Sequence, residues 1–237
     1  MRRFRAAGRW WRGALAGGAT TLGLAVAAEG LSAQQPVRDA GEAKALAILE
    51  AAAARYGAAA ALCADFRQQL SVPLLGEERT GAGRLCQEQP DHFAMRFTDP
   101  PGDAVVVDGT ALWIYYPSID PRQVLRLPVA AGEARGLDLH REFLSDPGTK
   151  YAAGYRGTED VDGRPAHVIR LTPKAPATYR AATVWIDVRT SVLRRVRIEE
   201  ENGNVRTVTL DHVRFDPEIP ADFFTFTPPA GAHVIRR

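Results

Sequence analysis

Residues 62–70, LCADFRQQL, decide the fold, because apolar and polar side chains alternate along them with a period of two. Successive side chains of a β-strand point to opposite faces, so this pattern predicts a strand with one apolar face. The residues expected on that face are Leu62, Ala64, Phe66, Gln68 and Leu70. Residues 79–87 are the predicted partner strand, reached by a reversal near Leu74 and Leu75.

The two cysteines of the chain, Cys63 and Cys86, fall on these two arms. A reversal near residues 74–75 would place them nearly opposite each other. In an oxidising compartment a cysteine pair forms a disulfide more often than a metal site. Such a cross-strand bond would stabilise the fold by about 3 kcal/mol on the loop-entropy model. Two free buried thiols are the alternative.

Outward from this hairpin, alternation and turn signals predict a long series of strands. They cover residues 92–97, 104–107, 112–116, 123–129, 150–157, 167–172, 181–188, 192–200 and 205–215. Asp-Gly at 108–109 and 162–163 and Asn-Gly at 202–203 are hairpin turn signals. The Ala-rich residues 39–56 predict one long helix, and residues 135–144 a short one. The class is therefore α+β, mainly β, with an antiparallel sheet that must curl and helices that can cover it.

The apolar face of this sheet is open to two interpretations. Phe66, Phe93, Met95, Phe97, Ile169 and Leu171 share that face. Periodicity identifies a buried face but does not distinguish a packed core from a ligand cavity. An ordinary core therefore stands beside the cavity as an alternative.

The N-terminus predicts export. Five arginines lie within residues 1–12, an apolar run covers residues 13–28, and small residues precede Gln34. This order is typical of a cleaved signal peptide, here residues 1–33, and the apolar run is shorter than the roughly 20 residues of a membrane-spanning helix. Residues 34–237 are the predicted single domain. They carry 25 basic and 27 acidic residues, and this net charge of −2 gives no support to nucleic-acid binding.

The sequence contains no recognisable enzyme motif, and we expect neither a catalytic site nor a cofactor. The five histidines are scattered, none with another at metal-ligand spacing, so no metal site is expected. Asp211 and His212 are adjacent in a predicted strand and should point to opposite faces. The acidic run at 199–201 adjoins a turn signal and is interpreted as a solvated hairpin end. Residues 81–83, GAG, indicate a bulge or a close backbone approach.

Several segments match the motifs of one known family. Residues 83–85 (GRL) with 89–93 (QPDHF) resemble its G-x-L and x-P-x-x-F segment. Residues 106–109 (VVDG) with 112–117 (LWIYYP) resemble its V-S-D-G and L-W-x-Y-x-P. Residues 66–68 (FRQ), 171–174 (LTPK) and 224–231 (FTFTPPAG) resemble its F-x-Q, L-T-P-K and F-x-F-x-P-P-x-G. In this order and spacing, over roughly residues 42–235, the chain specifically resembles the LolA family of periplasmic lipoprotein carriers.

The resemblance implies an unclosed antiparallel β-barrel of about ten to eleven strands, with helices as a lid over an apolar cavity. It implies a monomeric periplasmic carrier, not an enzyme, that binds the acyl chains of lipoproteins. It also implies an inner-membrane ABC-type release complex as donor and an outer-membrane receptor as acceptor. Together with the alternation, it predicts a cavity lined by Phe66, Leu70, Leu85, Phe93, Met95, Phe97, Val105, Val107, Ile169 and Leu171.

One position departs from the family pattern. Known carriers have Arg directly before the Pro of the x-P-x-x-F segment, where it contacts the lid, and this chain has Gln89. Glutamine can form a hydrogen bond but lacks the fixed cationic fork of arginine. Gln89 is therefore the expected lid contact. If its bond does not reproduce the gating of the family, the alternative function is binding or sensing of another lipidated ligand.

Overall fold

The computed structural model describes residues 35–129 and 139–236. The predicted signal peptide, residues 1–33, lies outside the described residues. Within the described ranges there are three helices: α1 (Gln35–Gly57), α2 (Leu139–Phe143) and α3 (Pro147–Lys150). The strands before α2 are β1 (Ala61–Val72), β2 (Glu77–Glu88), β3 (His92–Asp99), β4 (Ala104–Asp108), β5 (Ala111–Tyr115) and β6 (Gln123–Pro128). Those after α3 are β7 (Tyr151–Val161), β8 (Arg164–Pro173), β9 (Tyr179–Asp187), β10 (Leu193–Glu200), β11 (Val205–Phe215) and β12 (His233–Arg236).

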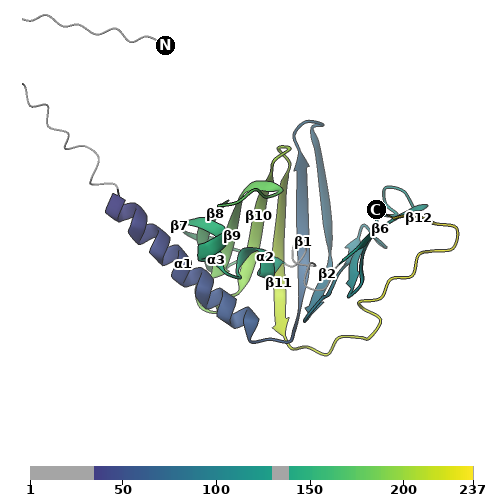
Figure 1. The fold of residues 1–237 in the computed structure, drawn as a ribbon, viewed down its shortest axis with the longest axis horizontal. Helices are drawn as coiled ribbons and strands as arrows, with labels where there is room; N and C mark the ends of the chain where they lie inside the picture. The colour runs from purple at the N-terminus through teal and green to yellow at the C-terminus, as the bar shows by residue number, and fades with distance from the viewer. Residues whose placement is uncertain (1–34, 130–138, 237) are drawn as a thin grey trace, which may run out of the picture.

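All twelve described strands belong to one sheet, in the order β12-β6-β5-β4-β3-β2-β1-β11-β10-β9-β8-β7. Two meanders, β1–β6 and β7–β11, are joined where β1 pairs antiparallel with β11. The first and last strands of this order, β12 and β7, do not pair with each other, so the sheet is curled but unclosed (Figure 1). This confirms the predicted fold class, with one strand more than expected. The additional strand is β12, which pairs in parallel with β6.

Helix α1 crosses the β7–β11 half of the sheet and packs against β7 and β9 (Figure 1). Its buried residues are Ala45, Leu49, Ala52 and Tyr56, which recur at helical spacing. The small alanines allow the helix backbone to approach the sheet closely. At its C-terminal end the Tyr56 hydroxyl accepts a hydrogen bond from the Leu193 backbone N–H at 3.1 Å. The helix is thus fixed to β10 as well as to the core.

The predicted disulfide is present. Cys63 and Cys86 are opposite each other in the β1–β2 register, and their sulfur atoms are bonded. Both side chains are buried on the outer face of the sheet, in a small apolar cluster with Phe224. The C-terminal segment, residues 216–232, supplies Phe224 to this cluster, and the Arg96 guanidinium donates hydrogen bonds to the carbonyls of Phe223 and Thr225 at 3.0 and 2.6 Å. The outer face of β1–β5 is therefore covered by a segment distant in sequence.

Gly81 and Gly83 each lie where a side chain would meet a neighbouring group, and that group differs between the two positions. The β2–β3 register shifts between Ala82 and Gly83, which confirms the predicted irregularity. A Cβ on Gly83 would lie 2.1 Å from the Arg96 carbonyl oxygen, so β2 and β3 approach each other too closely there for any side chain. A Cβ on Gly81 would lie 2.9 Å from the ring of Phe97. The absence of a side chain at Gly81 therefore leaves room for that ring on the concave face.

Candidate functional site

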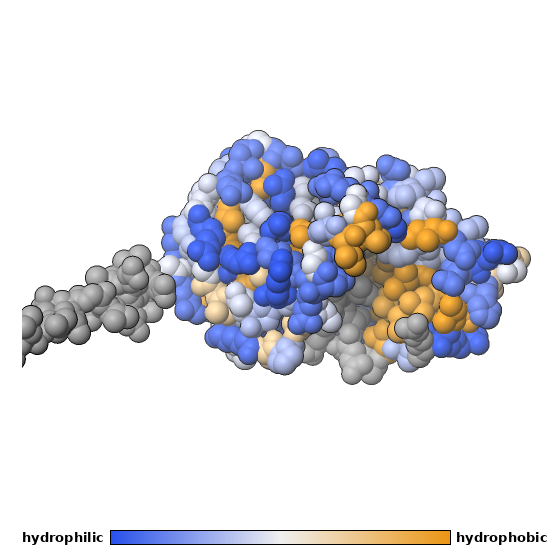
Figure 2. All heavy atoms as spheres, turned by 90° about the horizontal axis from the view of Figure 1, so that it is seen from above, coloured by the Kyte–Doolittle hydropathy of each residue, from blue (hydrophilic) through white to orange (hydrophobic). Residues whose placement is uncertain are grey.

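Two neighbouring cavities open on the concave face. The first has a volume of about 700 Å³, with apolar walls formed by Leu85, Phe93, Met95, Ile198 and Val208. The second, of about 600 Å³, has apolar walls formed by Leu70, Phe97, Pro100, Tyr116 and Ile119. Gln68 and Arg206 line both, so the cavities meet at these two side chains. Figure 2 shows hydrophobic side chains gathered around a hollow in this part of the molecule.

The short helix α2 forms one wall of the first cavity through Leu139, Glu142 and Phe143. We call α2 the lid helix. Phe143 is the buried residue of this helix, and Leu139 and Glu142 line the cavity beside it. The part of the predicted helix before residue 139 lies outside the described residues. The observed helix, Leu139–Phe143, falls within the predicted range of 135–144.

Polar contacts fix the lid helix at its C-terminal end. The Lys150 ammonium donates hydrogen bonds to the carbonyls of Arg141 and Glu142 at 2.6 and 2.9 Å. A cation at this end of a helix also interacts favourably with the helix dipole. The Tyr179 hydroxyl donates to the Glu142 carboxylate at 2.5 Å, and the Tyr151 hydroxyl donates to the Glu142 carbonyl at 2.8 Å. Burial, with the hydrogen bonds to Glu142, raises the pKa of Tyr179, so this hydroxyl stays protonated and can donate.

The lid helix also packs against the end of α1. The imidazole of His140 stacks on the Tyr56 ring, with centroids 4.7 Å apart and planes inclined by 17°. Burial lowers the pKa of His140 to about 4, and the positive charges of Arg141 and Lys150 contribute to that shift. His140 is therefore neutral at pH 7 and packs as an aromatic ring.

The residues predicted to line the cavity divide into two groups. Leu85, Phe93 and Met95 line the first cavity, and Leu70 and Phe97 line the second. The other five line neither of these cavities and are buried in the main core cluster on the same face, to which Leu85, Phe93 and Phe97 also belong. These five are Phe66, Val105, Val107, Ile169 and Leu171. The concave face is thus in part a packed core and in part a cavity wall.

The hydrogen bond of the Gln89 side chain does not go to the lid helix. Its carboxamide nitrogen donates to the Ala59 carbonyl, at 2.8 Å, in the connection between α1 and β1. The turn between β2 and β3 reaches the lid helix through another pair, Asp91 and Arg141, whose charged atoms are 3.8 Å apart. In this pair the cation, Arg141, is on the lid helix, and the anion, Asp91, is in the turn between β2 and β3.

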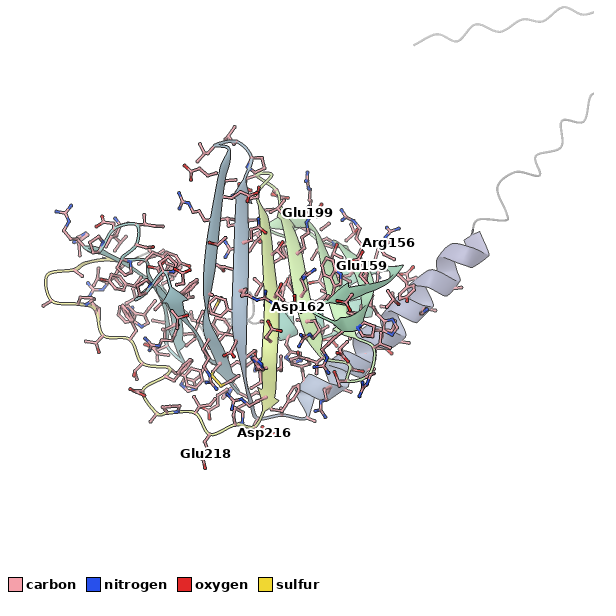
Figure 3. The ribbon with its side chains drawn as sticks, turned by 180° about the vertical axis from the view of Figure 1, so that it is seen from behind. Arg156, Glu159, Asp162, Glu199, Asp216 and Glu218 are labelled. Carbon is pink, nitrogen blue, oxygen red and sulfur yellow. A yellow bond between two sulfur atoms is a disulfide. The ribbon has the colours of Figure 1, made fainter. Side chains whose placement is uncertain are left out.

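Two interpretations of the sequence are corrected by the structure. Glu199 is not solvated but only 9% exposed, on the outer face of β10. Its Oε1 atom lies 3.0 Å from a guanidinium nitrogen of Arg170 and 2.6 Å from one of Arg197. Figure 3 labels Glu199 at the upper part of the sheet. Asp211 and His212 do not point to opposite faces of β11, because both side chains line one outer groove. The cause is the left-handed backbone of His212 (φ 49°), which lies at an irregularity of the β1–β11 register.

Sequence reasoning missed three residues that shape the site: Glu142, Tyr179 and Arg206. Tyr179 begins β9 and Glu142 lies on the lid helix, so no local pattern connects them. Arg206 occupies an alternation position that faces inward, opposite Leu70 in the register. A charged residue at an inward position of a strand is the signal that could have identified it.

Within residues 35–129 and 139–236, no group of three or more His, Cys, Asp or Glu side chains could hold a metal ion. No helix in the same ranges is long and apolar enough to cross a bilayer.

An unclosed antiparallel sheet with apolar cavities on its concave face, bordered by helices, defines a binding protein for an apolar ligand. The chain belongs to the LolA family, since the family model described as "Outer membrane lipoprotein carrier protein LolA" matches residues 58–227.

Named relatives agree with this family. An outer-membrane lipoprotein carrier protein of Ralstonia nicotianae is 28% identical over 165 residues, covering 67% of this chain and 70% of the relative. One of Pectobacterium atrosepticum is 27% identical over 169 residues, covering 71% and 77%. An uncharacterized conserved protein from Thermus thermophilus superposes with a TM-score of 0.51 at 15% identity, covering 82% of this chain and 99% of that chain. This last likeness supports the fold alone.

Proposed function

We propose that this protein is a periplasmic carrier that shields the acyl chains of lipoproteins in the cavities of its concave face and moves them from the inner to the outer membrane. The observation that carries the proposal is the pair of cavities of about 700 and 600 Å³ on one apolar face. The names of the relatives agree with it, since they are lipoprotein carriers.

The physical need for such a cavity follows from the hydrophobic effect. Each methylene group of an acyl chain exposed to water costs about 0.8 kcal/mol. A lipoprotein that leaves one membrane therefore needs an apolar enclosure until it reaches the next. Leu85, Phe93 and Met95 offer such a surface, and Met95 adapts its shape easily because its side chain is unbranched and flexible.

Loading and release require the enclosure to open. The lid helix has only five residues, and the rest of the fold holds it through polar contacts, one ion pair, the buried Phe143 ring and the stacking of His140 on Tyr56. The polar contacts exchange with water at modest net cost, about 1 kcal/mol each. A lid held in this way can move without unfolding the sheet, and that movement would admit the acyl chains and release them.

The proposal includes location and partners. We place the protein in the periplasm after removal of residues 1–33, with the cysteine pair oxidised there as its disulfide. An ABC-type release complex of the inner membrane would load it, and an outer-membrane receptor would accept the lipoprotein. It would act as a monomer, since one chain carries both cavities.

A release assay tests the proposal. Membranes that hold a radiolabelled triacylated lipoprotein and the release complex of the same source are incubated with ATP and the purified protein. The expected result is labelled lipoprotein in a soluble one-to-one complex with the protein. Label that stays in the membrane while the protein is folded would contradict the proposal.

Variants connect this result to the cavity. Phe93→Glu places a charge on the wall of the first cavity and should abolish the soluble complex. Met95→Glu makes the same change at a half-buried position, which keeps the test valid if Phe93→Glu does not fold. Val188→Glu is the matched control, because Val188 is 41% exposed and lies away from both cavities. If all three variants lost the soluble complex equally, the loss would not be caused by the change in the cavity wall.

A second candidate, a carrier or sensor of another lipid, is favoured by Gln89, whose hydrogen bond goes to Ala59 and not to the lid helix. Lipid extraction and mass spectrometry of the protein purified from its native periplasm separate the two. A lipoprotein in the extract supports the first candidate, and a free lipid in its place supports the second.

A further inference from the structure

The two cavities of the concave face meet at a polar boundary. Gln68 on β1 and Arg206 on β11 line both cavities. Each cavity also has the apolar wall described above, and further polar residues line its remaining parts, among them Glu200 and Asn202 in the first cavity and Arg79 and Asp103 in the second. Leu70 and Arg206 are direct partners in the β1–β11 register, and so are Gln68 and Val208. Both polar side chains therefore rise from the floor of the sheet between the two apolar compartments.

Arg206 has donors to spare at this boundary. Its ion-pair partner is Glu200, and the closest charged atoms are 3.7 Å apart, beyond hydrogen-bond distance. Among the described residues no side-chain hydrogen bond is formed by Arg206 or Gln68, whereas the guanidiniums of Arg170 and Arg197 bond directly to Glu199. A half-buried guanidinium with five N–H groups next to apolar walls favours a ligand that supplies acceptor oxygens there.

A single straight acyl chain does not suit this arrangement. To fill both cavities it would have to place methylene groups against the guanidinium and the carboxamide, which would lose their water without gaining acceptors. A lipid that branches at a polar group suits it better. Two apolar arms can occupy the two cavities while the oxygens of the branch point accept hydrogen bonds at the boundary.

We propose that Arg206, assisted by Gln68, forms a head-group subsite for a two-chain glycerol ester, with one acyl chain in each cavity. This subsite rests on the proposed function, because it assigns the polar part of the ligand that the cavities hold. The same chemistry occurs in the diacylglyceryl group of a lipoprotein and in a free diacyl phospholipid. The first is the cargo that the proposed function requires.

The test measures the affinity of the protein, purified from the periplasmic fraction after expression of the full chain, for three fluorescent probes. They are a peptide with a diacylglyceryl thioether, the same peptide with one palmitoyl chain, and a short-chain diacyl phospholipid below its micelle concentration. Wild type is compared with Arg206→Leu, Arg206→Lys and Arg180→Leu. Circular dichroism and thermal unfolding establish that each variant is folded.

Arg180→Leu is the matched control. Arg180 lines neither cavity, and its guanidinium lies 3.6 Å from the Glu199 carboxylate, close to the 3.7 Å between Arg206 and Glu200. We expect Arg206→Leu to weaken binding of the two-chain peptide about tenfold or more, the effect of losing hydrogen bonds to a charged donor. Binding of the one-chain peptide should change less than about twofold. The affinity of Arg206→Lys for the two-chain peptide should lie between those of wild type and Arg206→Leu, since an ammonium lacks the planar fork of a guanidinium.

The outcomes separate the subsite from the carrier function. If wild type binds the two-chain peptide and Arg206→Leu binds it equally well, the subsite is wrong and the carrier function stands. The subsite is also wrong if Arg206→Leu weakens both peptides equally, or if Arg180→Leu has the same effect as Arg206→Leu. Arg206-dependent binding of the phospholipid but not of the peptide would support the subsite and overturn lipoprotein as the cargo. Binding of none of the probes would overturn both proposals.

Discussion

Reduction of the disulfide tests how the β1–β2 hairpin contributes to stability. Cys63 and Cys86 are 23 residues apart in sequence. The loop-entropy relation for a closed loop of this length gives about 3 kcal/mol of stabilisation, because the bond restricts the unfolded chain. In a domain of this size each kcal/mol shifts Tm by roughly 2–4 °C, so reduction should lower Tm by about 6–12 °C.

Differential scanning calorimetry of the oxidised and reduced protein measures this shift. A Cys63→Ala, Cys86→Ala double variant should lose more than reduction alone. Both side chains are almost completely buried beside Phe224, and the smaller alanines leave space in that cluster. A shift on reduction of less than about 2 °C would refute the loop-entropy reasoning. It would indicate a hairpin that is already ordered in the unfolded chain.

Three further predictions concern the lid, the outer face and the sheet. His140 has a folded pKa of about 4, below its ordinary value of 6.5, so the unfolded chain binds more protons between these values. Stability should fall as the pH is lowered from 6.5 to 4, by up to about 3 kcal/mol, and denaturant titrations should show a flatter profile for His140→Phe. Arg96→Met should cost about 2 kcal/mol and speed proteolysis of the C-terminal segment, because it removes hydrogen bonds to two carbonyls there; an unchanged cleavage rate would count against this role. Gly83→Ala should destabilise by more than about 2 kcal/mol because its Cβ would overlap a backbone oxygen. Gly41→Ala on α1, with open space around it, should stabilise by roughly 0.5–1 kcal/mol, and equal effects at the two glycines would contradict the close approach.

The strands of the hairpins could be predicted because their causes are local. Alternation at residues 62–70 identified β1, the turn signals at 108–109, 162–163 and 202–203 separated later strands, and the reversal near Leu74 set Cys63 opposite Cys86. β12 could not be predicted in the same way. It has only four residues, and its partner β6 lies more than a hundred residues away in sequence.

The site was less accessible to sequence reasoning because alternation gives the face of a residue but not the space in front of it. Met95 and Ile169 are both inward residues, yet Met95 is half-buried and lines a cavity, whereas Ile169 is packed in the core. The polar part of the site depends on long-range contacts. Glu142 and Tyr179 are joined by a hydrogen bond although β7 and β8 separate them in sequence. Glu199 is buried because Arg170 and Arg197 lie on the same outer face, which the acidic run alone does not show.

The most direct test of the central claim locates the acyl chains on the protein. A lipoprotein that carries a photoreactive acyl chain is loaded onto the protein, irradiated, and the cross-linked peptides are identified by mass spectrometry. We predict cross-links to Leu85, Phe93 and Met95 on the sheet and to Phe143 on the lid helix. Cross-links confined to Leu74, which is 90% exposed at the tip of the β1–β2 hairpin, would contradict the claim that the concave cavities hold the chains.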